Sequence, residues 1–220
     1  MSNMIDYKEG VAMPVVVVSD SENWQDKVEI GGKGISKGIE FLLNKKEGKN
    51  TGWISYTLSK TTRQFENINS GLPYYYRYDR RHDFSFVWFK KIRENIDFSL
   101  TWIFSTGNAI TLATSKHLII GESIQTIEDN NRTELYDGHV YDGGRNNFRM
   151  RSYHRMDAGF NIRKDKKWGE RTWNISNYNL YNRQNPYFYF YSTGYDGNTK
   201  LLQQSFFPFI PSVTYSFKIK

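Results

Sequence analysis

Apolar and polar residues alternate along most of this chain with a period of two. The pattern is clearest in residues 96–105, whose apolar side chains fall on one face: Ile96, Phe98, Leu100, Trp102 and Phe104. Successive side chains of a β-strand point to opposite faces, so this period predicts strands with one apolar face. No stretch keeps a helical period over three turns, and the expected fold class is therefore all-β.

The alternation predicts about seven strands, joined in chain order as an antiparallel up-and-down meander. Their expected ranges are 33–44, 50–60, 81–90, 95–106, 152–164, 171–192 and 200–220. Residues 1–32 include four consecutive valines at 15–18. For that segment a further short strand and a loop ribbon both stay open.

The connections between these strands alternate strictly between short and long. Tight turns are expected near 45–49, 93–94 and 165–170, whereas long links cover 61–80 and 107–151. In a meander this order places all the tight turns at one end of the sheet. A soluble sandwich has no reason to sort its loops in this way. Transmembrane barrels do so, with short periplasmic turns and long extracellular loops.

Alternation alone does not say whether the apolar face meets a protein core or lipid, but three features favour lipid. The opposite face carries charged and amide groups in several strands, as a wet lumen allows: Glu40, Asp97, Arg155, Asp157, Asn161 and Arg163. Aromatic residues make up 17% of the chain. They crowd the strand ends as in an interfacial girdle, and the girdle tryptophans expected are Trp53, Trp88, Trp102 and Trp173. The strands are also longer than is usual in globular sheets. The alternative is a soluble, aromatic-rich, sugar-binding β-sandwich.

Composition excludes several classes of protein. The chain has no cysteine, which excludes disulfide scaffolds, cysteine-ligated zinc and thiol catalysis. Its net charge is +7, but 30 basic residues are interleaved with 23 acids and form no long block, so no nucleic-acid partner is expected. No apolar run is long enough for a transmembrane helix. Residues 1–6 do not look like a secretory signal, and since an outer-membrane barrel must be exported, we expect this chain to be the C-terminal part of a longer one.

An ordered set of short motifs extends this interpretation. The motifs occupy residues 34–43, 51–60, 78–83, 102–108, 153–157, 173–176, 181–186 and 207–217. In this order they resemble the C-terminal barrel region of TonB-dependent outer-membrane receptors, particularly those of Bacteroidetes. The resemblance runs from about residue 28 to residue 220.

The resemblance implies a transmembrane barrel of about 22 strands with an N-terminal plug. Such a receptor imports a scarce nutrient across the cell outer membrane with energy passed on by TonB. Residues 1–220 would be a C-terminal segment of that barrel, without the plug, the TonB box, the signal sequence and the earlier strands. Seven strands cannot close such a wall, so transport by this chain alone is not expected. A porin or an adhesin is the alternative within the outer membrane.

The partners follow from the same resemblance. They are outer-membrane lipid and lipopolysaccharide, the missing plug and N-terminal barrel strands, TonB through the missing N-terminal region, and the barrel-assembly machinery. The closing strand has four apolar residues on one face: Val213, Tyr215, Phe217 and Ile219. In the family, such a strand pairs with the first strand of the barrel and its aromatic pattern is read by the assembly machinery. Here Ile219 stands where the family often has an aromatic residue.

Two clusters are candidates for ligand binding. Arg80 and Arg81 lie in the densest ionic stretch, where paired donors could grip a carboxylate or phosphate. The alternative is that they begin a strand at the outer rim and pair with nearby acids or lipopolysaccharide phosphates. Three consecutive tyrosines, Tyr74, Tyr75 and Tyr76, could stack on a sugar or an aromatic ligand, or pack within a loop ribbon.

The sequence offers little for catalysis or metal binding. Its four histidines are scattered, with no His-x-x-x-His pair, and it contains no Gly-x-Ser-x-Gly elbow and no phosphate-binding glycine loop. Two aspartates and a histidine in the glycine-rich stretch 137–144 do not fit the spacing of a calcium loop. We therefore expect no catalytic residue, no metal and no cofactor.

Overall fold

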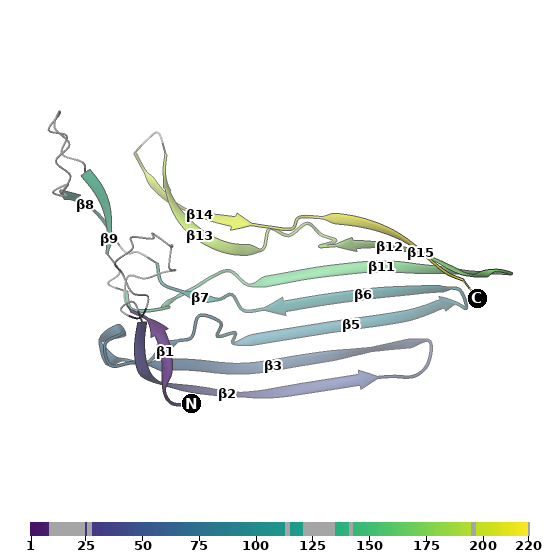
Figure 1. Cartoon of the computed structure of the whole chain (residues 1–220), viewed down its shortest axis with the longest axis horizontal. Helices are drawn as coiled ribbons and strands as arrows, with labels where there is room; N and C mark the ends of the chain where they lie inside the picture. The colour runs from purple at the N-terminus through teal and green to yellow at the C-terminus, as the bar shows by residue number, and fades with distance from the viewer. Residues whose placement is uncertain are drawn as a thin grey trace. The chain divides into compact units, whose positions relative to one another are not determined.

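The structure is a computed structural model that describes residues 1–8, 25, 28–112, 115–120, 135–140, 143–194 and 197–219 (Figure 1). The valines at 15–18 lie outside the described residues, so both interpretations of that stretch stay open. In the described ranges the regular elements are strands and short 3-10 segments such as the turn at Asn69–Gly71. In the part of the chain that is described, no helix has the length and apolar character needed to cross a bilayer.

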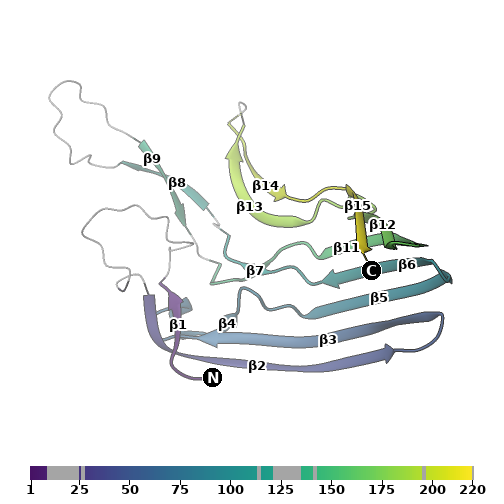
Figure 2. The same ribbon diagram turned by 45° about the vertical axis from the view of Figure 1, so that its right-hand side comes forward.

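Nine of the described strands form one sheet, in the order β1-β2-β3-β5-β6-β11-β12-β15, with β4 also paired to β3 (Figures 1 and 2). Their bounds are β1 Met4–Tyr7, β2 Val28–Lys45, β3 Asn50–Gln64, β4 Tyr74–Tyr75, β5 His82–Arg93, β6 Ile96–Ser105, β11 Tyr153–Lys166, β12 Gly169–Tyr178 and β15 Ile210–Ile219. The order rises steadily along the chain, and the registered pairs are antiparallel. The expected all-β antiparallel meander is confirmed.

Three small two-stranded sheets lie in the long links. They are β7 Ala109–Ile110 with β10 Phe148–Arg149, β8 Ser115–Ile120 with β9 Leu135–Val140, and β13 Pro186–Thr193 with β14 Thr199–Ser205. Between the long strands the connections run 46–49, 65–81, 94–95, 106–152, 167–168 and 179–209. Short and long connections therefore alternate through the whole meander, with one more long link than the sequence predicts.

That third long link corrects two of the expected strands. The single strands predicted at 171–192 and 200–220 are wrong, because β12 ends at Tyr178 and β15 starts only at Ile210. Asn179 and Asn182 adopt left-handed backbone angles, φ 55° and 53°, and Phe207 has φ 59°. Asparagine tolerates this region because its short amide hydrogen-bonds locally. Here the buried Asn179 amide donates to the carbonyls of Arg183 and Phe207.

The chain divides into two compact units. The sheet unit comprises residues 36–60, 80–108 and 150–220, and the link unit comprises residues 1–35, 61–79 and 109–149. Strands β2 and β3 run through both units.

In the sheet unit the register sorts side chains onto two faces, because directly paired residues of neighbouring strands share a face. One row across the sheet pairs Ile54, Phe86, Trp102 and Met156 in turn. A second apolar row on the same face pairs Phe98, Phe160, Ile175 and Val213. The polar face holds the alternate residues, among them Asp97, Arg155 and Asp157.

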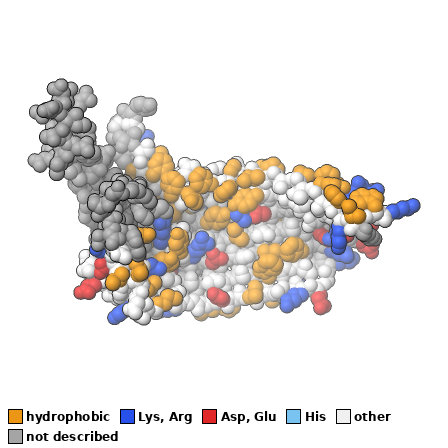
Figure 3. Space-filling model, viewed as in Figure 1, with side chains coloured by type: hydrophobic (Ala, Val, Ile, Leu, Met, Phe, Trp, Pro, Cys, Tyr) orange, Lys and Arg blue, Asp and Glu red, His pale blue; other side chains and the backbone are white. Residues whose placement is uncertain are grey.

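The apolar face of the sheet unit is largely uncovered. Exposed fractions of 39% for Ile54, 42% for Phe160, 47% for Ile175 and 63% for Val213 show that no described element packs over these side chains. Figure 3 shows hydrophobic side chains reaching the surface over much of the strand region. The sheet unit therefore has a two-faced wall rather than a core between two layers.

The link unit, by contrast, has a small core. Phe65, Ile68 and Tyr74 are 2%, 0% and 4% exposed and pack together, with Met4 against them. Gly32 is needed beside this core, since a Cβ there would lie 2.3 Å from the ring of Phe65.

Candidate functional site

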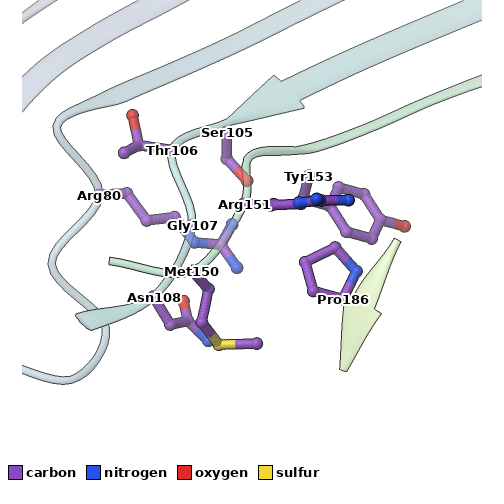
Figure 4. A pocket seen from close by; sticks show the side chains of 9 residues that line it. All are labelled: Arg80, Ser105, Thr106, Gly107, Asn108, Met150, Arg151, Tyr153 and Pro186. Atoms are coloured by element: carbon purple, nitrogen blue, oxygen red, sulfur yellow. The ribbon is translucent and has the colours of Figure 1, made fainter. Parts of the chain in front are cut away.

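A small cavity of about 50 Å³ opens in the sheet unit, at the end of the strands that carries the long links (Figure 4). It is lined where β5, β6, β11 and β13 meet those links, by Arg80, Ser105, Thr106, Gly107, Asn108, Met150, Arg151, Tyr153 and Pro186. In Figure 4 the Arg80 side chain points toward Gly107, and the Arg151 side chain points toward Tyr153 and Pro186. Two guanidinium groups thus come to one cavity from segments far apart in the chain.

The floor of the cavity depends on a close approach of two backbone segments. The Met150 amide donates to the Asn108 carbonyl at 2.9 Å. A Cβ on Gly107 would lie 2.1 Å from the Met150 carbonyl oxygen, so only glycine fits there without moving the main chain. The same approach brings Asn108 and Arg151 to the two sides of the cavity.

A hydrogen bond to its backbone and an ion pair of its side chain hold Arg80 at the cavity. The Ser59 hydroxyl donates to the Arg80 carbonyl at 2.8 Å, and Arg80 Nη1 lies 3.4 Å from Asp83 Oδ2. Both side chains of this ion pair are nearly half exposed, at 47% and 45%, so the pair contributes little to stability.

A second hollow of about 60 Å³ shares Tyr153 and Pro186 with the cavity. Its other lining residues are mostly aromatic: Tyr178, Asn185, Tyr187, Phe206 and Phe207. Phe206 and Tyr187 have ring centroids 4.6 Å apart, which joins the two ends of the link that carries β13 and β14. The sheet unit therefore presents a cationic cavity beside an aromatic hollow.

A hydrogen-bonded ladder lies on the polar face of the sheet unit. Arg155 binds the Tyr178 and Tyr153 hydroxyls and forms an ion pair with Asp157 at 2.9 Å. Further along β11, Arg163 pairs with Asp97 at 2.6 Å. Each arginine on this face has its carboxylate, so the ladder leaves little free charge.

The link unit contains a partly buried ionic cluster around Asp6. The carboxylate accepts from the Tyr74 hydroxyl at 2.7 Å, from Arg145 at 3.0 Å and from Arg63 at 3.4 Å. Burial, with the hydrogen bond to Asp6, raises the pKa of the Tyr74 hydroxyl above its ordinary value. One carboxylate thereby joins β1, β3, β4 and the segment before β10.

The three tyrosines suggested for ligand binding lie in the link unit. Tyr74 is in its core with the hydroxyl on Asp6, Tyr75 lies under Arg149 at 5.2 Å, and Tyr76 lies under Arg63 at 3.8 Å. Their role as ligand contacts stays a prediction. Their rings already pack against protein groups.

The ionic stretch 79–83 separates into different environments. Asp79 is fully buried and accepts from Arg149 at 2.7 Å and from the Thr61 amide at 2.6 Å. Arg80 lines the cavity of the sheet unit, whereas Arg81 does not. The backbone carbonyl of Arg81 accepts from the Ser59 amide, as strand pairing requires.

The four tryptophans expected in an interfacial girdle divide between the two faces. By register Trp88, Trp102 and Trp173 lie on the apolar face, and Trp173 packs against Tyr215 at 4.7 Å. Trp53 lies on the opposite face, where it packs against Phe89 at 6.3 Å.

The sequence does not predict several of the residues that line the cavity, above all Arg151, Asn108 and Tyr153. One signal could have found Arg151. Arg80 and Arg151 each stand shortly before a strand at its long-link end, and a meander brings those strand starts to one edge.

Within the described residues, no three His, Asp or Glu side chains are grouped to hold a metal ion. Comparison of the chain with known protein families, with curated proteins and with solved structures finds no match. What the chain does is therefore inferred from its sequence and its geometry.

Proposed function

We propose that this chain forms part of the wall of an outer-membrane β-barrel, as C-terminal strands of a nutrient receptor of the TonB-dependent type. The observation that carries the proposal is the uncovered apolar face of the sheet unit, which lies opposite a hydrogen-bonded polar face. Lipid on one side and a wet lumen on the other would satisfy both faces.

The edges of the sheet unit support the same proposal. Among the described strands, β15 pairs only with β12, and residues 36–45 of β2 pair only with β3. Each edge carries exposed apolar side chains, such as Phe41 at 63% and Ile219 at 68%. Free backbone groups in hydrocarbon cost several kcal/mol each. Further strands of a larger barrel would pair these edges.

The alternation of connections is the third support. The short connections 46–49, 94–95 and 167–168 join neighbouring strands at one end, and the long links start and end at the other end, where the cavity lies. In an outer-membrane barrel the long-link end faces the medium. The cavity would then lie where a ligand arrives.

The test uses the full-length gene product. We expect it in the outer-membrane fraction, extracted only by detergent, with a gel mobility that changes on boiling. Uptake of its nutrient should stop when the TonB system is deleted. A detergent-free, monomeric, water-soluble product would refute the barrel and favour the sandwich, and TonB-independent permeation would favour a porin.

A further inference from the structure

We propose that the cavity between Arg80 and Arg151 is an anion-binding subsite for an acidic ring compound. The cavity would take the carboxylate or phosphate of the ligand, and the ring would lie on the adjoining aromatic hollow. This assignment rests on the proposed function in one respect, since it identifies the ligand with the nutrient of the receptor.

Unused hydrogen-bond donors point to an anion. Among the described residues, the Arg151 guanidinium, the Asn108 amide and the Ser105 hydroxyl have no hydrogen-bond or ion-pair partner, yet all three residues line the cavity. Ser105 is only 4% exposed. Arg151 is exposed and Asn108 partly so, so these donors face the open space of the cavity, where a bound acceptor would replace the water that hydrates them.

The charge around the cavity is positive on balance. Arg80 and Arg151 bring two cations, and Asp83 offsets only Arg80, through a long and exposed contact. Arginine presents paired donors that match the two oxygens of a carboxylate or phosphate. A ligand with an anionic group would therefore meet complementary charge and geometry.

Arg183 shows what a purely structural arginine looks like in the same unit. Its guanidinium donates to the Ser152 carbonyl at 3.0 Å and to Asn185 Oδ1 at 3.2 Å. Arg151 makes no such contact, and only its backbone amide is bound, to the Tyr189 hydroxyl. The difference separates an arginine that holds a link in place from one left available.

The adjoining hollow supplies the ring-binding half of the subsite. Tyr153 lines both spaces, so a ligand reaching from one to the other would pass along its ring. Tyr187, Phe206 and Phe207 are 64%, 45% and 62% exposed, which leaves aromatic surface for stacking. Stacking surfaces of this kind accept both sugar rings and aromatic rings.

The experiment measures binding to the full-length gene product in detergent by calorimetry. The probes are galacturonate and benzoate, with galactose and benzyl alcohol as neutral counterparts and inorganic phosphate as a ring-free anion. We expect an acidic ring probe to bind more tightly than its neutral counterpart and than phosphate. Preference for galacturonate or for benzoate tells a sugar acid from an aromatic acid.

Variants then locate the site. Arg151→Gln and Arg80→Gln should each weaken the acidic probe about tenfold or more. Arg93→Gln is the matched control, because it removes the same charge at the other end of β5 and should bind as the wild type does. Arg151→Lys should keep part of the affinity, since it retains the charge but not the paired donors.

Three results would overturn the assignment: no binding of any acidic ring probe, equal binding of acidic and neutral probes, or unchanged affinity in both arginine variants. Boiling-dependent gel mobility of every variant reports the barrel separately. A folded barrel without acid binding refutes the subsite alone. Acid binding by a water-soluble product, lost in Arg151→Gln, refutes the barrel alone.

Discussion

Two neighbouring substitutions, Leu100→Arg and Thr101→Arg, should have opposite consequences if the apolar face of the sheet meets lipid. Leu100 is the fifth of ten residues in β6, so it lies near the middle of the proposed wall. It is paired with Trp88 on one side and with Ala158 on the other. Thr101 faces the other way and is paired with Val87 and Asp157.

The magnitudes follow from these positions. An arginine on the lipid face at mid-membrane costs about 2–4 kcal/mol. An arginine at position 101 would stand beside the partly exposed Asp157, where an ion pair contributes about 0–1 kcal/mol. Leu100→Arg should therefore be less stable than Thr101→Arg by roughly 2–5 kcal/mol, or about one and a half to three and a half powers of ten in the folding equilibrium.

The assay is refolding of the full-length gene product into lipid vesicles over a range of urea concentrations. The folded fraction is the band whose gel mobility changes on boiling. A third variant, Phe104→Arg, lies on the same face near the long-link end of β6. It should cost less than Leu100→Arg, because the penalty for arginine falls toward the membrane interface.

Two outcomes would refute this reasoning. If Thr101→Arg is as damaging as Leu100→Arg, the two faces do not meet different solvents. If Phe104→Arg costs as much as Leu100→Arg, the penalty has no depth dependence and the face packs into a protein core.

Three further predictions concern other parts of the chain. The raised pKa of Tyr74 means that, above about pH 10, the unfolded chain releases a proton that the folded chain keeps. Stability should therefore fall as pH rises from there, and Tyr74→Phe should flatten that fall in urea midpoints. Gly52→Ala should destabilise the β3–β5 pair by about 1–3 kcal/mol, because Gly52 has φ 142° and a Cβ there would lie 2.0 Å from the Val87 carbonyl oxygen. Hydrogen exchange of the β3 and β5 amides should become faster, and unchanged exchange would contradict the prediction. Deleting 213–220 should remove the full-length product from the outer membrane, whereas Lys220→Ala should change little; normal levels of inserted protein after the deletion would contradict this.

The sequence predicts the sheet well where one signal governs the backbone. The period of two sets the long strands β2, β3, β5, β6 and β11, since every second side chain belongs to one face. It fails after Tyr178. There alternating aromatics at 187–191 continue the strand pattern, although Asn179 and Asn182 have already turned the chain. Asparagine occurs in strands and in turns, so the sequence alone does not predict the left-handed conformation of Asn179. The structure explains it, because the Asn179 amide donates to the carbonyls of Arg183 and Phe207.

The site residues are harder to predict than the strands, because their partners are distant in the sequence. Asp6 and Arg145 are 139 positions apart, and no local pattern connects them. The adjacent arginines Arg80 and Arg81 look alike in the sequence, yet only Arg80 lines the cavity. Which of two neighbours faces a cavity depends on register, which a single strand does not reveal.

Register also couples the apolar wall to the cavity. Ser105 is paired with Asp83 on β5 and with Tyr153 on β11, and this pair of contacts brings the starts of those two strands to one level. Arg80 stands three residues before Asp83, and Arg151 stands two residues before Tyr153. The pairing of β5, β6 and β11 therefore sets the distance between the two arginine backbones, and the long links do not. A slip of one residue between β6 and β11 would turn the apolar residues of one strand to the polar face. The same slip would move Tyr153 away from Ser105 and carry Arg151 out of line with Arg80. The burial preferences of the long strands therefore hold the two arginines in place, and the proposed subsite needs no rigid loop of its own.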